Sequence, residues 1–219
     1  MKIRVLLADD HTVVRFGLRM LVETAEDMEV VGEAANGREA VELAQRLTPH
    51  VAVLDVIMPQ LNGLDAARRI ARESPQTKIL ILSTYAHDHF LEQAFAASVS
   101  GYLTKETAAS ELIKAIRTVF SGKQFFTPSI SKKVVELAPS RTAARRMGFS
   151  NKPLTARESE VLQLIAEGDS NKAIAEKLQI SIKTIEKHRQ SVMQKLNIHE
   201  TAGLTRYAIN HGMIQIQPM

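Results

Sequence analysis

The sequence predicts an α/β domain built on a five-stranded, doubly wound parallel sheet, followed by a small all-α domain. Short apolar runs alternate with amphipathic stretches in the first half of the chain, whereas only helical patterns follow residue 154. The net charge also differs between the two parts of the chain. Residues 1–122 hold 13 Lys/Arg and 16 Asp/Glu, a net of −3, and residues 123–219 hold 15 and 8, a net of +7. The basic second part favours a polyanion as its partner.

The five strands are expected at the apolar runs of residues 3–8, 29–32, 51–54, 79–82 and 101–103. Three of these runs are continuous and rich in Val, Ile and Leu, with polar residues only at their ends, which is typical of strands that helices cover on both faces. Between the runs, apolar residues recur at helical spacing, as at Val14, Leu18 and Leu21. This alternation predicts a parallel sheet with right-handed crossovers.

The stretch between the two patterns is interpreted as a linker. Residues 122–150 break the rhythm of the first half and carry Pro, Ser and several basic residues. The predicted domains are therefore residues 1–121 and residues 151–219. The chain has no Cys, which excludes disulfides and thiolate chemistry, and no apolar run approaches the ~18 residues of a membrane span.

The second domain is expected to hold four helices. Thr155 and Glu158 have the spacing of a capping box at the start of the first helix. Ser170 and Ser181 are expected to cap the next two, and Thr201 to begin the fourth. The second and third helices are joined by about three residues, which is typical of a helix-turn-helix.

Five polar residues follow the predicted strands: Asp9, Asp10, Asp55, Ser83 and Lys105. Parallel strands bring their carboxyl ends to one edge of a sheet, where open α/β sheets place their sites. Three carboxylates in one crevice would repel one another, and Mg²⁺, which prefers oxygen ligands, would relieve that repulsion. An ionised Asp can attack phosphorus while Lys105 and Ser83 bind the remaining oxygens. The sequence therefore predicts phosphoryl transfer at this edge.

Four motifs around these residues resemble the receiver domain of bacterial response regulators. They are LLADDH at 6–11, LDVIMPQLNG at 54–63, ILILSTY at 79–85 and GYLTK at 101–105. The resemblance covers residues 1–121 and implies a flavodoxin-like fold.

The resemblance also implies a role for each matching residue. Asp55 is expected to accept a phosphoryl group from a sensor histidine kinase. The implied Mg²⁺ ligands are Asp9, Asp10, Asp55 and the backbone carbonyl of Ile57. Ser83 and Lys105 are expected to bind the phosphoryl oxygens, and Tyr102 to reorient when Ser83 engages the phosphate.

Two departures from the common receiver pattern have consequences. Many receivers carry Pro after the conserved lysine, in a cis bond, whereas Glu106 follows Lys105 here and the isomer stays open. Ile57 and Tyr85 occupy positions where polar groups help a water molecule attack the phosphoryl group in other receivers. Their bulk predicts slow self-dephosphorylation.

The third helix of the second domain has an outer face that suits the major groove of DNA. That face carries Lys183, Lys187, Gln190 and Gln194, with Glu186 beside them. Lys can contact guanine, Gln can pair with adenine, and Glu can accept from cytosine. The hydroxyl of Thr184 suits a phosphate oxygen.

The segment LTARESEVLQLIAEGDSNKAIAEKLQISIKTIEKHRQSVMQKLNI, which begins at Leu154, resembles the LuxR-type helix-turn-helix of the NarL/FixJ branch. By this resemblance, Glu186, Lys187 and Gln190 are the base readers. Lys183, Thr184 and Lys195 are expected to hold the DNA backbone. The fourth helix, around residues 202–209, is where such domains pair.

Together the two resemblances imply a cytoplasmic, phosphorylation-dependent transcriptional regulator with no membrane partner. We expect it to bind double-stranded promoter DNA, to form a homodimer when phosphorylated, and to perform no catalysis beyond phosphoryl self-transfer to Asp55 and slow self-dephosphorylation. A phosphatase of the haloacid-dehalogenase type is one alternative, although it needs an acid where Ile57 stands. A DNA-binding protein whose receiver never carries phosphate is the other, and the intact set of five polar residues argues against it.

Overall fold

The computed structural model describes residues 1–84, 88–128, 130–131, 133 and 154–214. The chain divides into two compact units, with the boundary between residues 146 and 147. Among the described residues, no helix combines the length and the apolar character that crossing a membrane requires.

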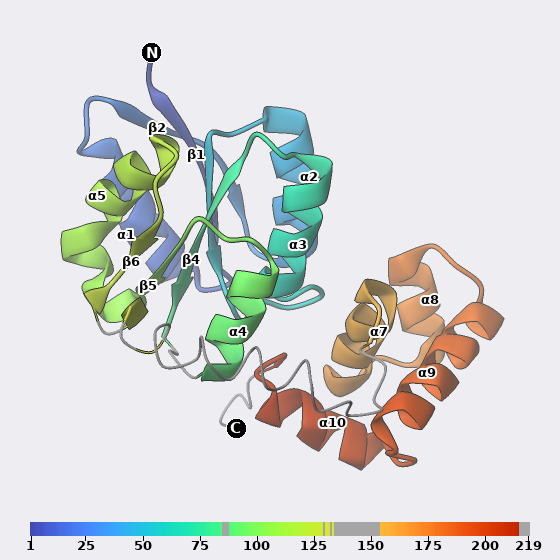
Figure 1. The fold of residues 1–219 in the computed structure, drawn as a ribbon. Coiled ribbons are helices and arrows are strands. Elements are labelled where there is room, and N and C mark those ends of the chain that lie inside the picture. Colours follow the sequence, from blue (N-terminus) through green and yellow to red (C-terminus); the bar gives the residue numbers. More distant parts are fainter. Residues whose placement is uncertain (85–87, 129, 132, 134–153, 215–219) are drawn as a thin grey trace. The chain divides into compact units, whose positions relative to one another are not determined.

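The first unit is built around a parallel sheet of six strands (Figure 1). The strands are β1 (Ile3–Ala8), β2 (Met28–Ala34), β3 (Val51–Asp55), β4 (Lys78–Ser83), β5 (Gly101–Thr104) and β6 (Phe125–Phe126). Their order in the sheet is β2-β1-β3-β4-β5-β6, and every neighbouring pair is parallel. The predicted doubly wound parallel sheet is confirmed, and its five predicted strands are all present.

The sixth strand corrects the predicted count of five. Phe125 and Phe126 pair with Gly101 and Tyr102 of β5, although they lie in the predicted linker. Gly101 permits this approach, because a Cβ atom there would lie 2.6 Å from the carbonyl oxygen of Phe125. A strand of two residues leaves no apolar periodicity in the sequence, so only tertiary pairing identifies it. Residues 134–150 of the predicted linker lie outside the described residues.

Helices cover both faces of this sheet (Figure 1). On one face α1 (Thr12–Glu23) and α5 (Ala108–Phe120) bury Leu18, Val22, Leu112, Ile116 and Val119 against the strands. On the other face α2 (Gly37–Leu47), α3 (Gly63–Glu73) and α4 (Asp88–Ala96) complete a second apolar cluster. Because both faces are covered, the central strands β3 and β4 are buried almost along their whole length.

The second unit consists of helices among its described residues: α7 (Ala156–Ala166), α8 (Asn171–Leu178), α9 (Ile182–Leu196) and α10 (Thr201–Asn210). The predicted caps are confirmed. Thr155 and Glu158 form a reciprocal capping box, and Ser170 and Ser181 accept backbone N–H groups at the starts of α8 and α9. Gln179, with φ 52°, ends α8 in the left-handed region and starts the short turn into α9.

Candidate functional site

The strand register brings the five predicted polar residues to one edge of the sheet. Ala8 pairs with Leu54, so Asp9 lies beside Asp55 in the next positions along β1 and β3. Asp55 in turn pairs with Leu82, which precedes Ser83. Ser83 pairs with Thr104, the residue before Lys105. The sheet therefore aligns residues that are far apart in the chain at its carboxyl edge.

The ammonium group of Lys105 lies between two buried carboxylates. Its Nζ is 2.7 Å from Oδ2 of Asp9 and 2.7 Å from Oδ2 of Asp55. The other oxygen of Asp55, Oδ1, accepts a hydrogen bond of 2.7 Å from the backbone N–H of Val56. Asp9 is fully buried and Asp55 nearly so, whereas the side chain of Asp10 is partly exposed. One oxygen of Asp55 is thus fixed by the backbone and the other by Lys105.

The pKa of Asp55 is raised to about 6. Burial is the largest cause, because removing a carboxylate from water disfavours its charged form. The neighbouring Asp9 raises it further, while Lys105 and the Val56 N–H oppose the shift. Burial acts to lower the pKa of Lys105, but the Asp55 and Asp9 carboxylates outweigh burial and raise it. Near neutral pH, Asp55 is therefore mostly ionised and Lys105 is charged.

The acidic residues at this edge fit a hard divalent cation. Asp9, Asp10, His11 and Asp55 each offer a ligand atom, and these atoms lie within 4.8 Å of one another. Oδ2 of Asp9 and Oδ1 of Asp10 are shielded from solvent, and they lie 2.7 Å from Nζ of Lys105 and 2.8 Å from Nδ1 of His11, respectively. Mg²⁺ takes oxygen ligands such as these carboxylates. His11 was not predicted at this site, although it follows the two acids directly in the sequence.

The loop after β3 is held close to Asp55 by a glycine. A Cβ atom on Gly63 would lie 1.8 Å from the backbone oxygen of Asp55, so no larger residue fits without moving the loop. The N–H of Gly63 donates to the carbonyl of Val56, and Asn62 caps α3 by accepting from Asp65 N–H. The sequence motif Asn62-Gly63 indicated a turn, and the structure shows a tight return of the chain to the site. Ile57 lies in this loop, half-buried against the core.

Ser83 and Tyr102 form a buried pair next to the carboxylates. Both side chains are fully buried, and a hydrogen bond joins them. Burial raises the pKa of Tyr102 to about 12, and the bond to Ser83 opposes part of that rise.

The Lys105–Glu106 bond is trans, which answers the question that the sequence left open. Tyr85, the second bulky residue of the prediction, lies outside the described residues.

The predicted base-reading residues share the exposed face of α9. Lys183, Glu186, Lys187 and Gln190 are all exposed and follow one another at helical spacing. Ile185 and Val192 are fully buried on the opposite side. Arg189 donates to Asn171 of α8 and to Thr201 of α10, and so holds α9 between its neighbours. These four side chains are therefore exposed to solvent within their own unit, and Arg189 ties α9 to both neighbouring helices.

Two residues predicted to hold the DNA backbone already have partners inside the unit. Nζ of Lys195 lies 2.6 Å from Oε2 of Glu158, a buried residue of α7. The hydroxyl of Thr184 is 2.8 Å from the Ser181 hydroxyl at the cap of α9. Lys195 thus has a structural partner that no local pattern indicated, since Glu158 is 37 residues away in the chain.

Both units match known families. Residues 5–117 match the response regulator receiver domain, and residues 152–208 match the bacterial regulatory proteins of the luxR family.

Almost the whole chain is similar to proteins named as a response regulator and as a transcriptional regulator. It is 35% identical to the response regulator protein VraR of Staphylococcus epidermidis over 215 residues, which cover 98% of this chain and 100% of VraR. It is 36% identical to the transcriptional regulatory protein MctR of Rhizobium johnstonii, over 97% of this chain and 96% of MctR.

The chain is also similar to solved structures of response regulators. RcsB of Salmonella enterica serovar Typhimurium, bound to promoter rprA in the presence of the phosphomimetic BeF₃⁻, is 30% identical with a TM-score of 0.60. That match covers 94% of this chain and 98% of RcsB. A LuxR-family two-component response regulator from Aurantimonas is 34% identical with a TM-score of 0.60, over 65% of this chain and 99% of that one.

Proposed function

Because this chain belongs to the response regulators that join a receiver domain to a LuxR-type DNA-binding domain, we propose that phosphorylation of Asp55 controls its binding to promoter DNA. The observation that carries this proposal is the geometry of Asp55, a buried carboxylate held beside Asp9 and Lys105.

The proposed reaction is phosphoryl transfer to a carboxylate oxygen of Asp55. The oxygen attacks the phosphorus of a phosphohistidine on a sensor kinase, an O–P bond forms, and the P–N bond to the imidazole breaks. Lys105, now 2.7 Å from Asp55, compensates the charge that accumulates on the phosphoryl oxygens. The buried site limits access of competing water.

Asp9, Asp10 and Asp55 would hold Mg²⁺, with the backbone carbonyl of Ile57 as the ligand that the family implies. When bound, the ion neutralises carboxylate and phosphoryl oxygens at the same time. The ionised state of Asp55 is the nucleophilic one, and the pKa of about 6 keeps it mostly ionised at neutral pH.

Ser83 and Tyr102 supply a route by which the phosphoryl group changes the surface of the first unit. Ser83 shares a hydrogen bond with Tyr102 and lies beside the strand position of Asp55. A phosphoryl oxygen that accepts the Ser83 hydroxyl competes for this bond. Such competition gives two arrangements of the pair whose populations depend on phosphorylation.

In the second unit, the exposed face of α9 is proposed to enter the major groove of double-stranded DNA, with Lys187, Glu186 and Gln190 reading bases. RcsB has been solved bound to a promoter and as dimers on DNA, which supports promoter DNA and a homodimer as partners here. A dimer would place two recognition helices about one DNA turn apart.

The test of phosphoryl acceptance uses acetyl phosphate with Mg²⁺ and the full chain. We expect one hydroxylamine-labile phosphoryl group per chain, lost in Asp55→Asn and kept in the control Glu106→Gln, which replaces an exposed carboxylate next to Lys105. A chain that takes up no phosphoryl group would contradict the proposal.

The two alternatives predict different outcomes of the same experiment. A phosphatase of the haloacid-dehalogenase type releases inorganic phosphate over many turnovers, whereas we propose no catalysis beyond self-transfer and slow hydrolysis. Such a phosphatase needs a second acid at the position where this chain has Ile57, which supports our proposal over the phosphatase. A receiver that never carries phosphate would give no adduct at all.

A further inference from the structure

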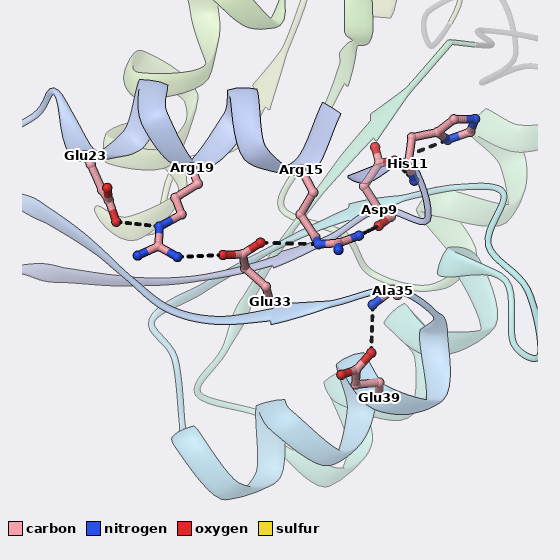
Figure 2. A network of polar contacts seen from close by, with 8 residues as sticks. All are labelled: Asp9, His11, Arg15, Arg19, Glu23, Glu33, Ala35 and Glu39. Atoms are coloured by element: carbon pink, nitrogen blue, oxygen red, sulfur yellow. Dashed lines mark hydrogen bonds and ion pairs between the residues drawn. The ribbon is translucent and has the colours of Figure 1, made fainter. Parts of the chain in front are cut away.

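Arg15, on α1, links the phosphoacceptor edge to the neighbouring strand β2. Its guanidinium donates a hydrogen bond of 2.6 Å to the backbone carbonyl of Asp9 and another, of 3.2 Å from Nε, to Oε2 of Glu33 (Figure 2). The side chain of Arg15 is only 16% exposed. A planar guanidinium fork can hold two acceptors in a fixed geometry, so this contact restricts where the backbone of Asp9 lies.

Asp9 is held at four separate points, of which Arg15 provides one and Lys105, at carboxylate Oδ2, provides another. Its backbone N–H donates to Ala34 at the end of β2, and its carboxylate Oδ1 accepts from the N–H of His11. Asp9 follows the last residue of β1, where the strand ladder ends and a buried carbonyl needs another donor. Arg15 supplies that donor, and Glu33 keeps it oriented.

Only one of the two arginines on this face of α1 reaches Asp9. Arg19 also pairs with Glu33, at 3.0 Å, and with Glu23, but it makes no contact with Asp9 (Figure 2). Its side chain is 48% exposed, against 16% for Arg15. The two residues therefore share a helix and a partner but differ in their access to the site.

We propose that Arg15, oriented by Glu33, is a positioning residue for the divalent cation at the phosphoacceptor site. This inference rests on the proposed function, which assigns the cation to Asp9, Asp10 and Asp55. Arg15 acts through the backbone of Asp9: it keeps the Asp9 carboxylate at the spacing from Asp10 and Asp55 that one ion can span. Groups that orient metal ligands in this way typically change metal affinity by about 10- to 100-fold.

Coulomb's law alone predicts the opposite effect, and this makes the inference testable. A cationic guanidinium near the site repels a divalent cation, so its removal should tighten binding if charge were the only influence. If position dominates, removal of Arg15 releases the Asp9 backbone and weakens binding.

The experiment is titration of the full chain with Mn²⁺, followed by the electron paramagnetic resonance signal of the free ion. We expect Arg15→Ala to weaken Mn²⁺ binding by roughly 10-fold or more. Arg19→Ala, the matched control, should stay within about twofold of wild type, and Glu33→Gln should fall between the two. Circular dichroism at the titration temperature shows that each variant is folded.

Two results would overturn the inference: unchanged or tighter Mn²⁺ binding by folded Arg15→Ala, or an equal loss in Arg19→Ala. A merely structural role for Arg15 would lower the melting temperature without metal and leave the dissociation constant unchanged. If the wild-type chain bound no Mn²⁺, the metal part of the proposed function would fail together with this inference. If wild type bound Mn²⁺ and Arg15→Ala bound it with the same affinity, only the inference about Arg15 would fail, and the proposed metal site would stand.

Discussion

Asp55 shows how a single buried carboxyl is prepared for reaction at the expense of stability. Its pKa of about 6 exceeds the ordinary value of 3.8, so the folded chain binds more protons than the unfolded chain between those two pH values. The contribution of Asp55 to stability therefore falls as the pH rises from about 4 to 6, and it stays low above pH 6.

We expect Asp55→Asn to stabilise the metal-free chain above pH 6, by up to about 2–3 kcal/mol, because the amide carries no charge into the buried site. Near pH 4 the advantage should disappear. Thermal unfolding in the presence of a chelator, at pH 4.5 and pH 8, measures the difference. Glu106→Gln, at an exposed position, is the control, and an equal gain at both pH values would contradict the assignment.

Ile57 bears on the lifetime of the phosphoryl group. It lies half-buried in the loop after β3, two residues from Asp55, and its side chain offers no hydrogen bond to a water molecule. We expect Ile57→Asn to shorten the lifetime of phosphorylated Asp55, because the amide can orient the attacking water. Phosphoryl loss is followed after removal of acetyl phosphate. Ile57→Val, which stays apolar, should change the lifetime little, and an unaltered lifetime in Ile57→Asn would refute the steric explanation.

Helices α7 and α9 are joined by an ion pair between buried Glu158 and partly exposed Lys195. Burial by itself would raise the pKa of Glu158, but hydrogen bonds from Lys195, Ser191 and the Thr155 N–H together hold it at about 2. The ordinary value is 4.5, so this group contributes stability above pH 4.5 and loses that contribution as the pH falls toward 2.

We expect Glu158→Gln to destabilise the chain by about 1–2 kcal/mol at pH 7, since solvent screens part of the interaction. The difference from wild type should shrink at pH 3. Calorimetric unfolding at the two pH values tests this expectation. Glu176→Gln, at an exposed site on α8, is the control. A pH-independent difference would mean that the charge of Glu158 is not responsible.

The same ion pair changes how the DNA contacts of α9 should be tested. Loss of Lys195 would disturb Glu158 as well as any contact with phosphate, so Lys183, which is exposed, is the better probe of the DNA backbone. We expect Lys187→Ala to alter sequence preference by about 1–3 kcal/mol at one base position.

Lys183→Ala should instead weaken all sequences alike and reduce the slope of log affinity against log salt by about 0.9. Binding measured against a panel of sequences at several salt concentrations separates the two. An even loss across all sequences in Lys187→Ala would show that the base readers are assigned wrongly.

At the scale of the whole molecule, the proposed function requires coupling between Asp55 and α9. Coupling energies of this kind are typically 1–3 kcal/mol, or about 5- to 150-fold in affinity. We expect acetyl phosphate to increase promoter affinity of the wild-type chain within that range and to leave Asp55→Asn unchanged. An electrophoretic mobility shift assay with and without the phosphoryl donor measures this change in promoter affinity. The control Glu106→Gln should behave as wild type. Equal responses of wild type and Asp55→Asn would exclude coupling through this residue.

The parallel sheet, the helix-turn-helix with its caps and the five polar residues at one edge could all be predicted from the sequence. These follow from short-range periodicity and from the rule that parallel strands end together. The exposed face of α9 was equally predictable, since helical spacing places its residues.

Four features could not be predicted and depend on contacts between elements: the two-residue strand β6, the approach of Gly63 to Asp55, and the contacts of Arg15 with Asp9 and of Lys195 with Glu158. Each of these depends on where two separately formed elements meet. A periodic pattern describes one element at a time, so it carries no information about the distance between side chains or backbone atoms of different elements.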